Sequence, residues 1–206
     1  MQLFDAAGLS DGAFEQILSF LRTGGVIGFP TDTAYGLGAD PFNEKAVRQI
    51  FEIKGRPEGK PILLLVNSIS MASSVCHMSD SARALAERFW PGPLTMILPA
   101  RENVPSVVTA GTGNVGVRWP ASEFALRLVG ALGQPITATS ANRSGIPSSV
   151  TAVEVCEQFG DSLKFVIDGG KLPARGGSTL LDLTESPPRL LREGPIPESD
   201  LNSVLK

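Results

Sequence analysis

The spacing of apolar residues predicts helices that alternate with strands over the first part of the chain. After Ser10, which can cap a helix, apolar residues recur at helical intervals as far as Leu21, and Gly24 and Gly25 end the pattern. The same reasoning predicts further helices that begin near Asn43, Ser79, Ser122, Thr151 and Pro197. The helix at Thr151 opens with a T-x-x-E capping box and runs to Phe159.

Short apolar runs between these helices predict strands. They lie at 26–29, 61–66, 94–100, 115–119, 135–140, 164–168, 179–183 and 188–192. The run "PILLLV" (61–66) is apolar throughout, as expected for a central strand covered on both faces. Because helices and strands alternate early and strands crowd together late, we expect an α/β fold with a mixed sheet. No linker or internal repeat divides the chain, so residues 1–206 are expected to form a single domain.

Composition narrows the class of protein. The chain has 206 residues, 42% of them hydrophobic, which suffices for the core of one domain. A net charge of -3 argues against a surface that binds nucleic acid throughout, although a local basic patch stays open. The only histidine, His77, leaves no His-based triad or multi-His metal site. Cys76 and Cys156 are isolated and are expected to be packed thiols in a reducing compartment.

The ends and the apolar runs of the chain predict its location. The first residues lack the basic and apolar regions of a signal peptide. No apolar run approaches the roughly 18 residues that span a bilayer. We therefore expect a cytoplasmic protein with no membrane partner.

Small polar residues and glycines follow the strand at 26–29, in "PTDTAYGLGAD" (30–40). Thr31 and Thr33 offer hydroxyl groups, and Gly36 and Gly38 would let the backbone approach a ligand closely. The alternative is an ordinary turn in which the Asp32 carboxylate caps local amides. The residues alone leave both interpretations open.

Three cations gather in "KGRPEGKP" (54–61), just before the apolar run. The prolines predict an extended loop, so Lys54, Arg56 and Lys60 are expected on a loop and not along a helix. Arg56 offers a planar fork suited to phosphate or carboxylate. Surface pairing with Glu52 and Glu58 is the alternative, since such pairs are common. The position at a strand edge favours a ligand site.

Other strand ends carry similar groups. Ser140 and Asn142 are two residues apart, so in an extended segment both side chains would point to one side. Arg118 and Arg192 each end an apolar strand, where a lone arginine is usually a structural ion-pair partner. Because cations and hydroxyl groups recur at several strand ends, structural ion pairs alone are a less convincing explanation, and a ligand site is favoured. "GTGNVG" (111–116) leads into a strand-like run, which argues against a dinucleotide-binding turn.

The candidate site is rich in cations and hydroxyls and poor in bases. Such a set suits positioning and charge stabilisation on phosphates, so it favours phosphoryl or nucleotidyl transfer. The acids that merit attention are Asp32, Asp168 and Asp182, as structural anchors or as indirect contacts of magnesium. No carboxylate pair has a convincing spacing for acid–base catalysis.

Eight motifs occur in an order that resembles the YrdC-like family of threonylcarbamoyl-AMP synthases. They are "PTDTAYGLG", "KGRP" followed by "KP", "WPGPLT", "VGVRWP", "TSANRSG", "DGG", "GGSTLLD" and "REG". The resemblance runs from about Gly24 to Gly194. It implies one α/β domain whose twisted sheet, with helices around it, borders a large basic concave cleft.

The resemblance also implies a reaction. Members of the family join L-threonine, bicarbonate and ATP into threonylcarbamoyl-AMP and release pyrophosphate. Downstream threonylcarbamoyl-transferase proteins then modify an adenosine next to the anticodon of tRNA. Mg²⁺ is expected to arrive with the triphosphate, and no metal site of the protein itself is expected. Direct binding of tRNA or double-stranded RNA is a further possibility that the family raises.

Site residues follow from the motifs. The phosphate-handling, catalytic set implied by the family comprises Lys54, Arg56, Ser140 and Asn142. The ATP site would be completed by Lys60, Ser148 and Arg192. The threonine site would comprise Thr33, Arg118, Ala138 and Ser178. Leu65 stands where some relatives carry a histidine.

Other readings of the same residues stay open. Longer relatives add a C-terminal domain over the cleft, so this chain is expected to be a short form with a more open cleft. One rival function is an RNA-binding module without catalysis, which needs only a basic concavity. Another is a carbamoyl-transfer domain of the kind found in hydrogenase-maturation proteins.

Overall fold

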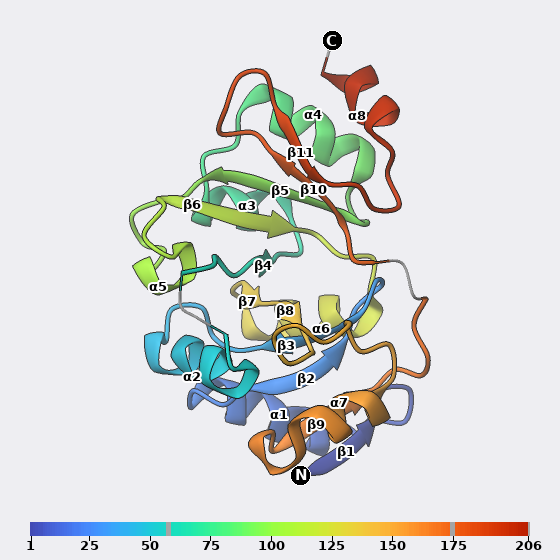
Figure 1. The fold of residues 1–206 in the computed structure, drawn as a ribbon. Coiled ribbons are helices and arrows are strands. Elements are labelled where there is room, and N and C mark those ends of the chain that lie inside the picture. Colours follow the sequence, from blue (N-terminus) through green and yellow to red (C-terminus); the bar gives the residue numbers. More distant parts are fainter. Residues whose placement is uncertain (57–58, 174–175, 206) are drawn as a thin grey trace.

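The computed structural model in Figure 1 describes residues 1–56, 59–173 and 176–205. The helices are α1 (Asp11–Arg22), α2 (Glu44–Lys54), α3 (Ile69–Val75), α4 (Asp80–Phe89), α5 (Ser106–Thr109), α6 (Glu123–Leu132), α7 (Ala152–Phe159), η1 (Gly160–Ser162) and α8 (Glu198–Val204). The strands are β1 (Gln2–Asp5), β2 (Ile27–Pro30), β3 (Tyr35–Gly38), β4 (Leu64–Leu65), β5 (Leu94–Pro99), β6 (Asn114–Arg118), β7 (Ile136–Thr137), β8 (Thr139–Ser140), β9 (Phe165–Asp168), β10 (Thr179–Asp182) and β11 (Arg189–Arg192).

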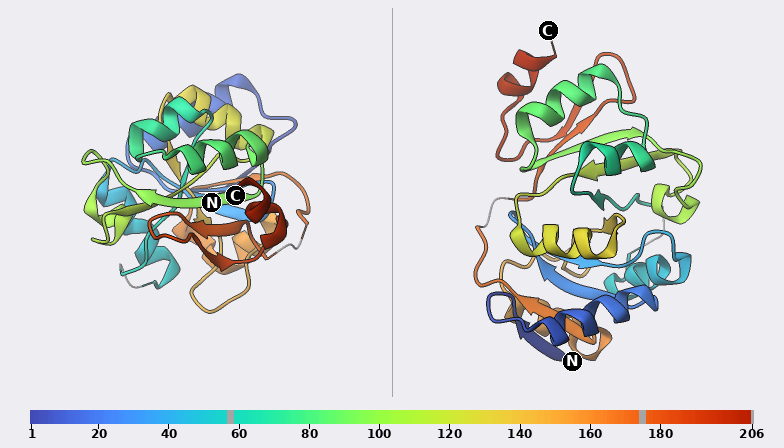
Figure 2. Two further views of the ribbon diagram at one scale, coloured as in Figure 1. Left: turned by 90° about the horizontal axis from the view of Figure 1, so that it is seen from above. Right: turned by 180° about the vertical axis from the view of Figure 1, so that it is seen from behind.

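These strands form two mixed sheets, so the α/β prediction is confirmed and the expectation of one sheet is wrong. Across the described residues, the first sheet has the order β1-β9-β2-β3-β8 and the second the order β11-β10-β5-β6-β4-β7. Figure 1 shows the second sheet in the upper half of the molecule and the first in the lower half. The two chain termini lie at opposite ends, as the rear view in Figure 2 also shows.

The run predicted as one strand over 135–140 explains why there are two sheets. Its first part, β7, pairs with β4 in the second sheet, and its last part, β8, pairs with β3 in the first. Ala138 lies between them, and its amide donates to the carbonyl of Leu63 at 2.9 Å. The chain therefore crosses from one sheet to the other within a single residue.

Capping side chains begin the helices where the sequence predicts them. Ser10 accepts a hydrogen bond from the amide of Ala13, and Asn43, Ser79 and Ser122 cap α2, α4 and α6 in the same way. The buried residues of α1 are the predicted apolar ones, Phe14, Ile17, Leu18 and Leu21. The capping box is present in a shifted form, because Glu154 accepts from the amide of Val150 at 2.7 Å.

Several elements differ from the prediction. The apolar run 61–66 contributes only the two-residue strand β4, although Ile62, Leu64 and Leu65 are buried. β1, β3, α3 and α5 were not predicted from the sequence. In β3, glycine serves packing: a Cβ at Gly38 would lie 2.7 Å from the Phe29 ring and 2.8 Å from Ile136. Glycine is therefore needed at position 38 because the side chains of Phe29 and Ile136 fill the space that a Cβ would occupy.

The cysteines are structural in the described part of the chain. Cys76 is fully buried, and burial raises the pKa of its thiol to about 12. Cys156 is partly exposed, and burial raises the pKa of its thiol as well. Both side chains thus hold their protons at neutral pH. Among the described residues, no helix combines the length and the apolar character needed to cross a bilayer.

Candidate functional site

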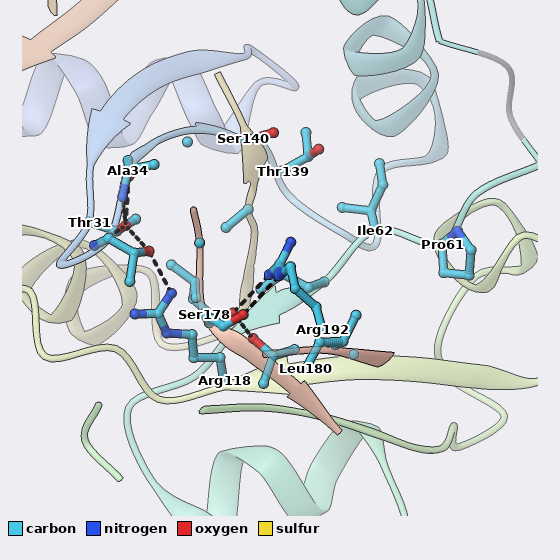
Figure 3. Close-up of a pocket in the computed structure, with 18 of the residues that line it drawn as sticks. Thr31, Ala34, Pro61, Ile62, Arg118, Thr139, Ser140, Ser178, Leu180 and Arg192 are labelled. Atoms are coloured by element: carbon cyan, nitrogen blue, oxygen red, sulfur yellow. Dashed lines mark hydrogen bonds between the residues drawn. The ribbon is translucent and has the colours of Figure 1, made fainter. Parts of the chain in front are cut away.

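A cavity of about 480 Å³ lies where the two sheets face each other. Its walls come from the β2–β3 turn, from the residues around β4 and β8, and from β5, β6, β10 and β11. The charged residues among its described lining are Arg56, Arg118, Arg192 and Asp182. Figure 3 shows Arg118 directed toward the Thr31–Ala34 turn, and Arg192 directed toward Ser178. The cavity thus combines guanidinium groups with hydroxyl groups, as the sequence analysis predicted for the site.

Thr31, and not Asp32, holds the β2–β3 turn together. Its hydroxyl oxygen accepts from the amides of Thr33 at 3.2 Å and Ala34 at 3.3 Å. The same hydroxyl donates to the carbonyl of Ala34 at 2.6 Å. The proposal that Asp32 caps this turn is therefore wrong, because a threonine hydroxyl already serves its amides. The Asp32 carboxylate is left to serve Arg118.

Arg118, at the end of β6, is fixed on three sides. Its Nη1 donates to the hydroxyl of Thr33 at 2.9 Å, and its Nε donates to the carbonyl of Gly92 at 3.0 Å. Its Nη2 forms an ion pair with Asp32 at 2.6 Å, and the side chain is only 4% exposed. Burial lowers the pKa of Arg118, and the carboxylate of Asp32 opposes that shift. The ion pair thus keeps a buried cation in one orientation at the cavity wall.

Replacing Asp32 by Asn should weaken the fold because it leaves the buried guanidinium without its counter-charge. We expect the free energy of unfolding to fall by about 2–4 kcal/mol, measured by urea denaturation. Asp11→Asn is the matched control, since Asp11 pairs with Arg127 on the surface. That control should leave the urea midpoint unchanged. Equal midpoints for all three proteins would contradict the structural role of the Asp32–Arg118 pair.

A second guanidinium network joins β11, β10 and β5. Arg192 donates from Nε to the carbonyl of Ser178 at 2.9 Å and from Nη2 to its hydroxyl at 3.3 Å. The hydroxyl of Ser178 in turn lies 2.7 Å from that of Thr95. Burial lowers the pKa of Arg192. This network places a cation and two hydroxyl groups on the wall formed by the second sheet.

Arg56 reaches the cavity from the end of α2. Gly55 adopts the left-handed conformation (φ 60°) that ends the helix and turns the chain. The guanidinium of Arg56 donates to the hydroxyl of Thr139 and to the carbonyls of Lys60 and Pro61, each at 3.1 Å. Burial lowers the pKa of Arg56. All three hydrogen-bond partners of Arg56 are uncharged. They leave its positive charge unneutralised, which suits a residue that binds an anion.

Lys54 is the last residue of α2, so the expectation that it lies on a loop is wrong. Its ammonium group donates to the carbonyls of Ser140 and, at 2.6 Å, of Asn142. Its own carbonyl accepts from the amide of Ser144 at 3.0 Å. Its partners among the described residues are thus backbone groups and not a surface carboxylate such as Glu52. The suggested partner Glu58 lies outside the described residues.

The buried ammonium of Lys54 should make stability depend on pH. Burial, with a smaller contribution from Arg56, lowers the pKa of Lys54 from 10.5 to about 8. Between these two values the unfolded chain holds a proton that the folded protein has released, so rising pH favours folding. We expect the free energy of unfolding to rise over this window by up to about 3 kcal/mol relative to Lys54→Met. Urea denaturation at several pH values measures the difference, and parallel pH curves for the two proteins would contradict it.

The structure brings most of the predicted site residues to the cavity. Those that line it are Thr33, Arg56, Arg118, Ala138, Ser140, Ser148, Ser178 and Arg192. Lys54, Lys60 and Asn142 are not part of that lining. The side-chain amide of Asn142 donates to the carbonyls of Arg143 and Ile146, at 3.0 and 2.6 Å. The chain turns directly after Ser140, where the amide of Asn142 donates to its carbonyl at 2.9 Å, so the expected extended geometry is wrong.

Some lining residues were not predicted from the sequence. Thr95 and Asn114 are polar residues within or beside apolar strands, and a polar residue in such a run could have indicated a position on the cavity wall. Tyr35 also lines the cavity, but its burial could not be read from a glycine-rich turn. Leu65, at the position where some relatives carry a histidine, lies on the cavity wall opposite Arg118 in the β4–β6 register. A buried leucine thus stands beside Arg118 in the second sheet.

The three aspartates of interest all have partners. Asp32 pairs with Arg118, and Asp168 accepts from the hydroxyl of Tyr35 at 3.1 Å. Asp182 lines the cavity and accepts from the hydroxyl of Thr184 at 2.6 Å. Within the described ranges, no three histidine, cysteine or acidic side chains come together as a metal-binding group. Each of the three carboxylates thus bonds to a neighbouring side chain of the protein.

The α/β fold thus places a cavity between two mixed sheets, and the guanidinium and hydroxyl groups that line it have the chemistry that suits a small anionic ligand. The model of the Sua5/YciO/YrdC family, described as "telomere recombination", matches residues 19–194. The chain belongs to this family, and the resemblance drawn from its motifs is confirmed.

Relatives with assigned names are similar over most of the chain. The threonylcarbamoyl-AMP synthase of Pyrococcus abyssi is 45% identical over 90% of this chain and 55% of its own length. The threonylcarbamoyl-AMP synthase of Thiobacillus denitrificans is 39% identical over 84% of this chain and 92% of its own. The crystal structure of P. abyssi Sua5 complexed with L-threonine has a TM-score of 0.94 and 41% identity, covering 100% of this chain and 61% of that one. The chain thus spans somewhat more than half the length of the P. abyssi protein.

Proposed function

We propose that this protein is an L-threonylcarbamoyl-AMP synthase, an enzyme that makes threonylcarbamoyl-AMP and pyrophosphate from L-threonine, bicarbonate and ATP. The observation that carries the proposal is the cavity itself. Arg118 and Thr33 stand on one side of it, and Arg56 and Arg192 stand on others. The names of the two synthases and the threonine complex of the P. abyssi relative support this assignment.

L-Threonine is assigned to the Arg118 side. The guanidinium of Arg118 has more N–H donors than its bonds to Asp32, Thr33 and Gly92 use, so it can also bind a carboxylate. The hydroxyl of Thr33 is within reach of the same ligand. Ala138 and Ser178 complete this part of the wall. A small, partly apolar pocket with one fixed cation fits an amino acid of threonine's size.

ATP is assigned to the remaining cations and hydroxyls of the cavity. Arg56 and the hydroxyl of Ser140 would contact the phosphates, and Ser148 and Arg192 would complete the nucleotide site. Lys54 and Asn142 would contribute by holding the turn after Ser140, because their polar groups are bonded to its backbone. Lys60 would add a surface charge near the entrance. These cations are the basis for the proposal that the cleft is basic.

The proposed reaction has two steps. The neutral amine of threonine attacks carbon dioxide derived from bicarbonate, loses a proton and becomes a carbamate. A carbamate oxygen then attacks the α-phosphorus of ATP, and the bond to the β-phosphate oxygen breaks so that pyrophosphate leaves. Arg56 would stabilise the charge that develops on the leaving group. The protein's contribution is positioning and charge stabilisation, in keeping with a cavity rich in cations.

Mg²⁺ is proposed to enter with the triphosphate. The carboxylate of Asp182 lines the cavity and could bind a water molecule of the hydrated ion. Mg²⁺ would neutralise phosphate charge when bound. The product would pass in the cytoplasm to threonylcarbamoyl-transferase proteins that modify tRNA, with no membrane partner. Residues 1–206 would carry out the reaction as a single domain.

Mass spectrometry of the protein incubated with ATP, bicarbonate and single amino acids tests the function. Threonine should give an adenylate and pyrophosphate, whereas glycine and leucine should not. ATP binding without product, together with tight binding of double-stranded RNA, would favour the rival RNA-binding module. Transfer of a carbamoyl group from carbamoyl phosphate, with no need for threonine, would favour the carbamoyl-transfer domain.

A further inference from the structure

Tyr35 is the single tyrosine of the sequence, and it lies directly after the turn that carries Thr31 and Thr33. Its side chain is fully buried. The hydroxyl oxygen accepts from the amide of Gly169 at 2.9 Å, and the hydroxyl proton can reach the carbonyl of Gly170 at 2.8 Å or Asp168 at 3.1 Å. One hydroxyl group therefore lies within hydrogen-bond distance of all three residues of the turn at the end of β9, over residues 168–170.

The turn over residues 168–170 is also stabilised from within. The carboxylate of Asp168 accepts from the amide of Gly170 at 2.8 Å. Gly170 has a φ of +76°, which glycine adopts at little cost. Burial, together with Asp168, raises the pKa of Tyr35 to about 12, so its hydroxyl keeps the proton that it donates. The carboxylate of Asp168, the pairing of β9 with β1 and the tyrosine hydroxyl thus all hold this turn, and the hydroxyl is the link that joins it to β3.

The 168–170 turn packs against the base of the threonine turn. A Cβ built on Gly169 would lie 2.6 Å from Cγ and 2.7 Å from Cβ of Pro30. Pro30 ends β2 and immediately precedes Thr31, and it stands opposite Tyr35 in the β2–β3 register. Pro30 is held on another side too, because its carbonyl accepts from the hydroxyl of Ser122 at 3.2 Å. A shift of the 168–170 turn would therefore reach Pro30 and then the Thr31–Thr33 turn.

We propose that Tyr35 is a positioning residue for the amino-acid substrate, acting through the 168–170 turn, which supports Pro30 and thereby the Thr31–Thr33 turn beside Arg118. This inference rests on the proposed function, which assigns threonine to Thr33 and Arg118. Tyr35 places the hydroxyl of Thr33 and does not itself meet the reacting atoms. The Tyr35 hydroxyl acts on the threonine side, because its bonds are to residues 168–170. The bonds of Tyr35 to Ala141 and Ser149, near the proposed nucleotide side, are made by its backbone, which Tyr35→Phe leaves in place.

Two substitutions disturb the contact between the 168–170 turn and Pro30 by different means. Tyr35→Phe keeps the buried ring and removes the hydroxyl that holds the turn. Gly169→Ala keeps the hydroxyl and pushes a methyl group into Pro30. Thr137→Val is the matched control, since the buried hydroxyl of Thr137 also bonds to backbone groups, the amide and carbonyl of Ala39 at 2.8 and 3.3 Å.

Calorimetric titration of each folded variant with threonine alone and with ATP alone separates positioning from general stability. We expect Tyr35→Phe and Gly169→Ala to raise the dissociation constant of threonine about fivefold to tenfold, the equivalent of one lost neutral hydrogen bond. The dissociation constant of ATP should stay within about twofold of wild type in both variants. Thr137→Val should lower the thermal midpoint without changing the ratio of the two affinities.

Three results of the binding measurements would each overturn the proposal. They are unchanged threonine affinity in both variants, equal weakening of threonine and ATP, and the same selective loss in Thr137→Val. Hydrogen exchange of the ligand-free protein gives a second measurement that needs no substrate. The amides of Thr33 and Ala34, bonded to Thr31, should exchange faster in Tyr35→Phe than in wild type. If the wild-type protein binds no threonine, the proposed function fails. If these amides exchange at the same rate in Tyr35→Phe and wild type, the Tyr35 hydroxyl does not support the Thr31–Thr33 turn.

Discussion

Replacing Arg118 by Ala should raise the threonine concentration needed for half-maximal pyrophosphate release by about 100-fold or more, because truncating a buried charge partner costs at least 2–3 kcal/mol. Among the described lining residues, Arg118 is the cation that the proposal assigns to threonine, whereas Arg192, which bonds to Ser178, is assigned to the nucleotide. The KM for ATP should change little, because the proposed nucleotide contacts lie elsewhere. Steady-state kinetics with each substrate varied in turn measures both quantities.

The Arg118 experiment needs a control for folding, because the substitution also leaves the partly buried carboxylate of Asp32 without its partner. The double variant Arg118→Ala, Asp32→Asn removes that unpaired charge and should recover stability relative to Arg118→Ala alone. It should not recover the affinity for threonine. Recovery of threonine affinity in the double variant would show that Arg118 serves the fold and not the substrate.

Replacing Arg56 by Ala should lower the rate of pyrophosphate release by about 100-fold to 1,000-fold, as expected when one preorganised donor to developing charge is lost. The fold should persist, because the three hydrogen-bond acceptors of Arg56 lie at the edge of the cavity and become accessible to water. Arg56→Lys should be intermediate, since it keeps the charge and loses the planar fork. Initial rates of pyrophosphate release measure the series.

Arg88→Ala is the matched control for Arg56, because Arg88 is an exposed arginine on α4 that stacks on Phe89 away from the cavity. It should release pyrophosphate at the wild-type rate. Near-normal turnover by Arg56→Ala would refute the assignment of this residue to the nucleotide. A loss of similar size in both variants would point to a general effect of surface charge.

The hydrophobic pattern was enough to predict most helices, because capping and helical spacing are local properties. Ser10, Asn43, Ser79 and Ser122 each cap the helix that follows them. The pattern failed for β3, where Gly36 and Gly38 indicate a turn. Glycine is present there because Phe29 and Ile136 occupy the space of a side chain, and only the folded sheet reveals that contact.

The residue types of the site could be predicted, but the partner of each residue could not. Arg118 and Asp32 are 86 positions apart, and their pairing depends on how β6 meets the β2–β3 turn. Lys54 illustrates the same limit. Its place near the phosphate motif was evident, whereas its bonds to the carbonyls of Ser140 and Asn142 depend on long-range packing. Family motifs therefore identify candidates, and the geometry assigns how each one acts.

The passage of the chain through Ala138 fixes the width of the cavity. Since β7 belongs to one sheet and β8 to the other, the separation of the two sheets at this point is the length of a single residue of backbone. The bond from the amide of Ala138 to Leu63 holds that residue in place. A change in the spacing of the two walls at this point would therefore require that bond, or the pairing of β7 or β8, to break.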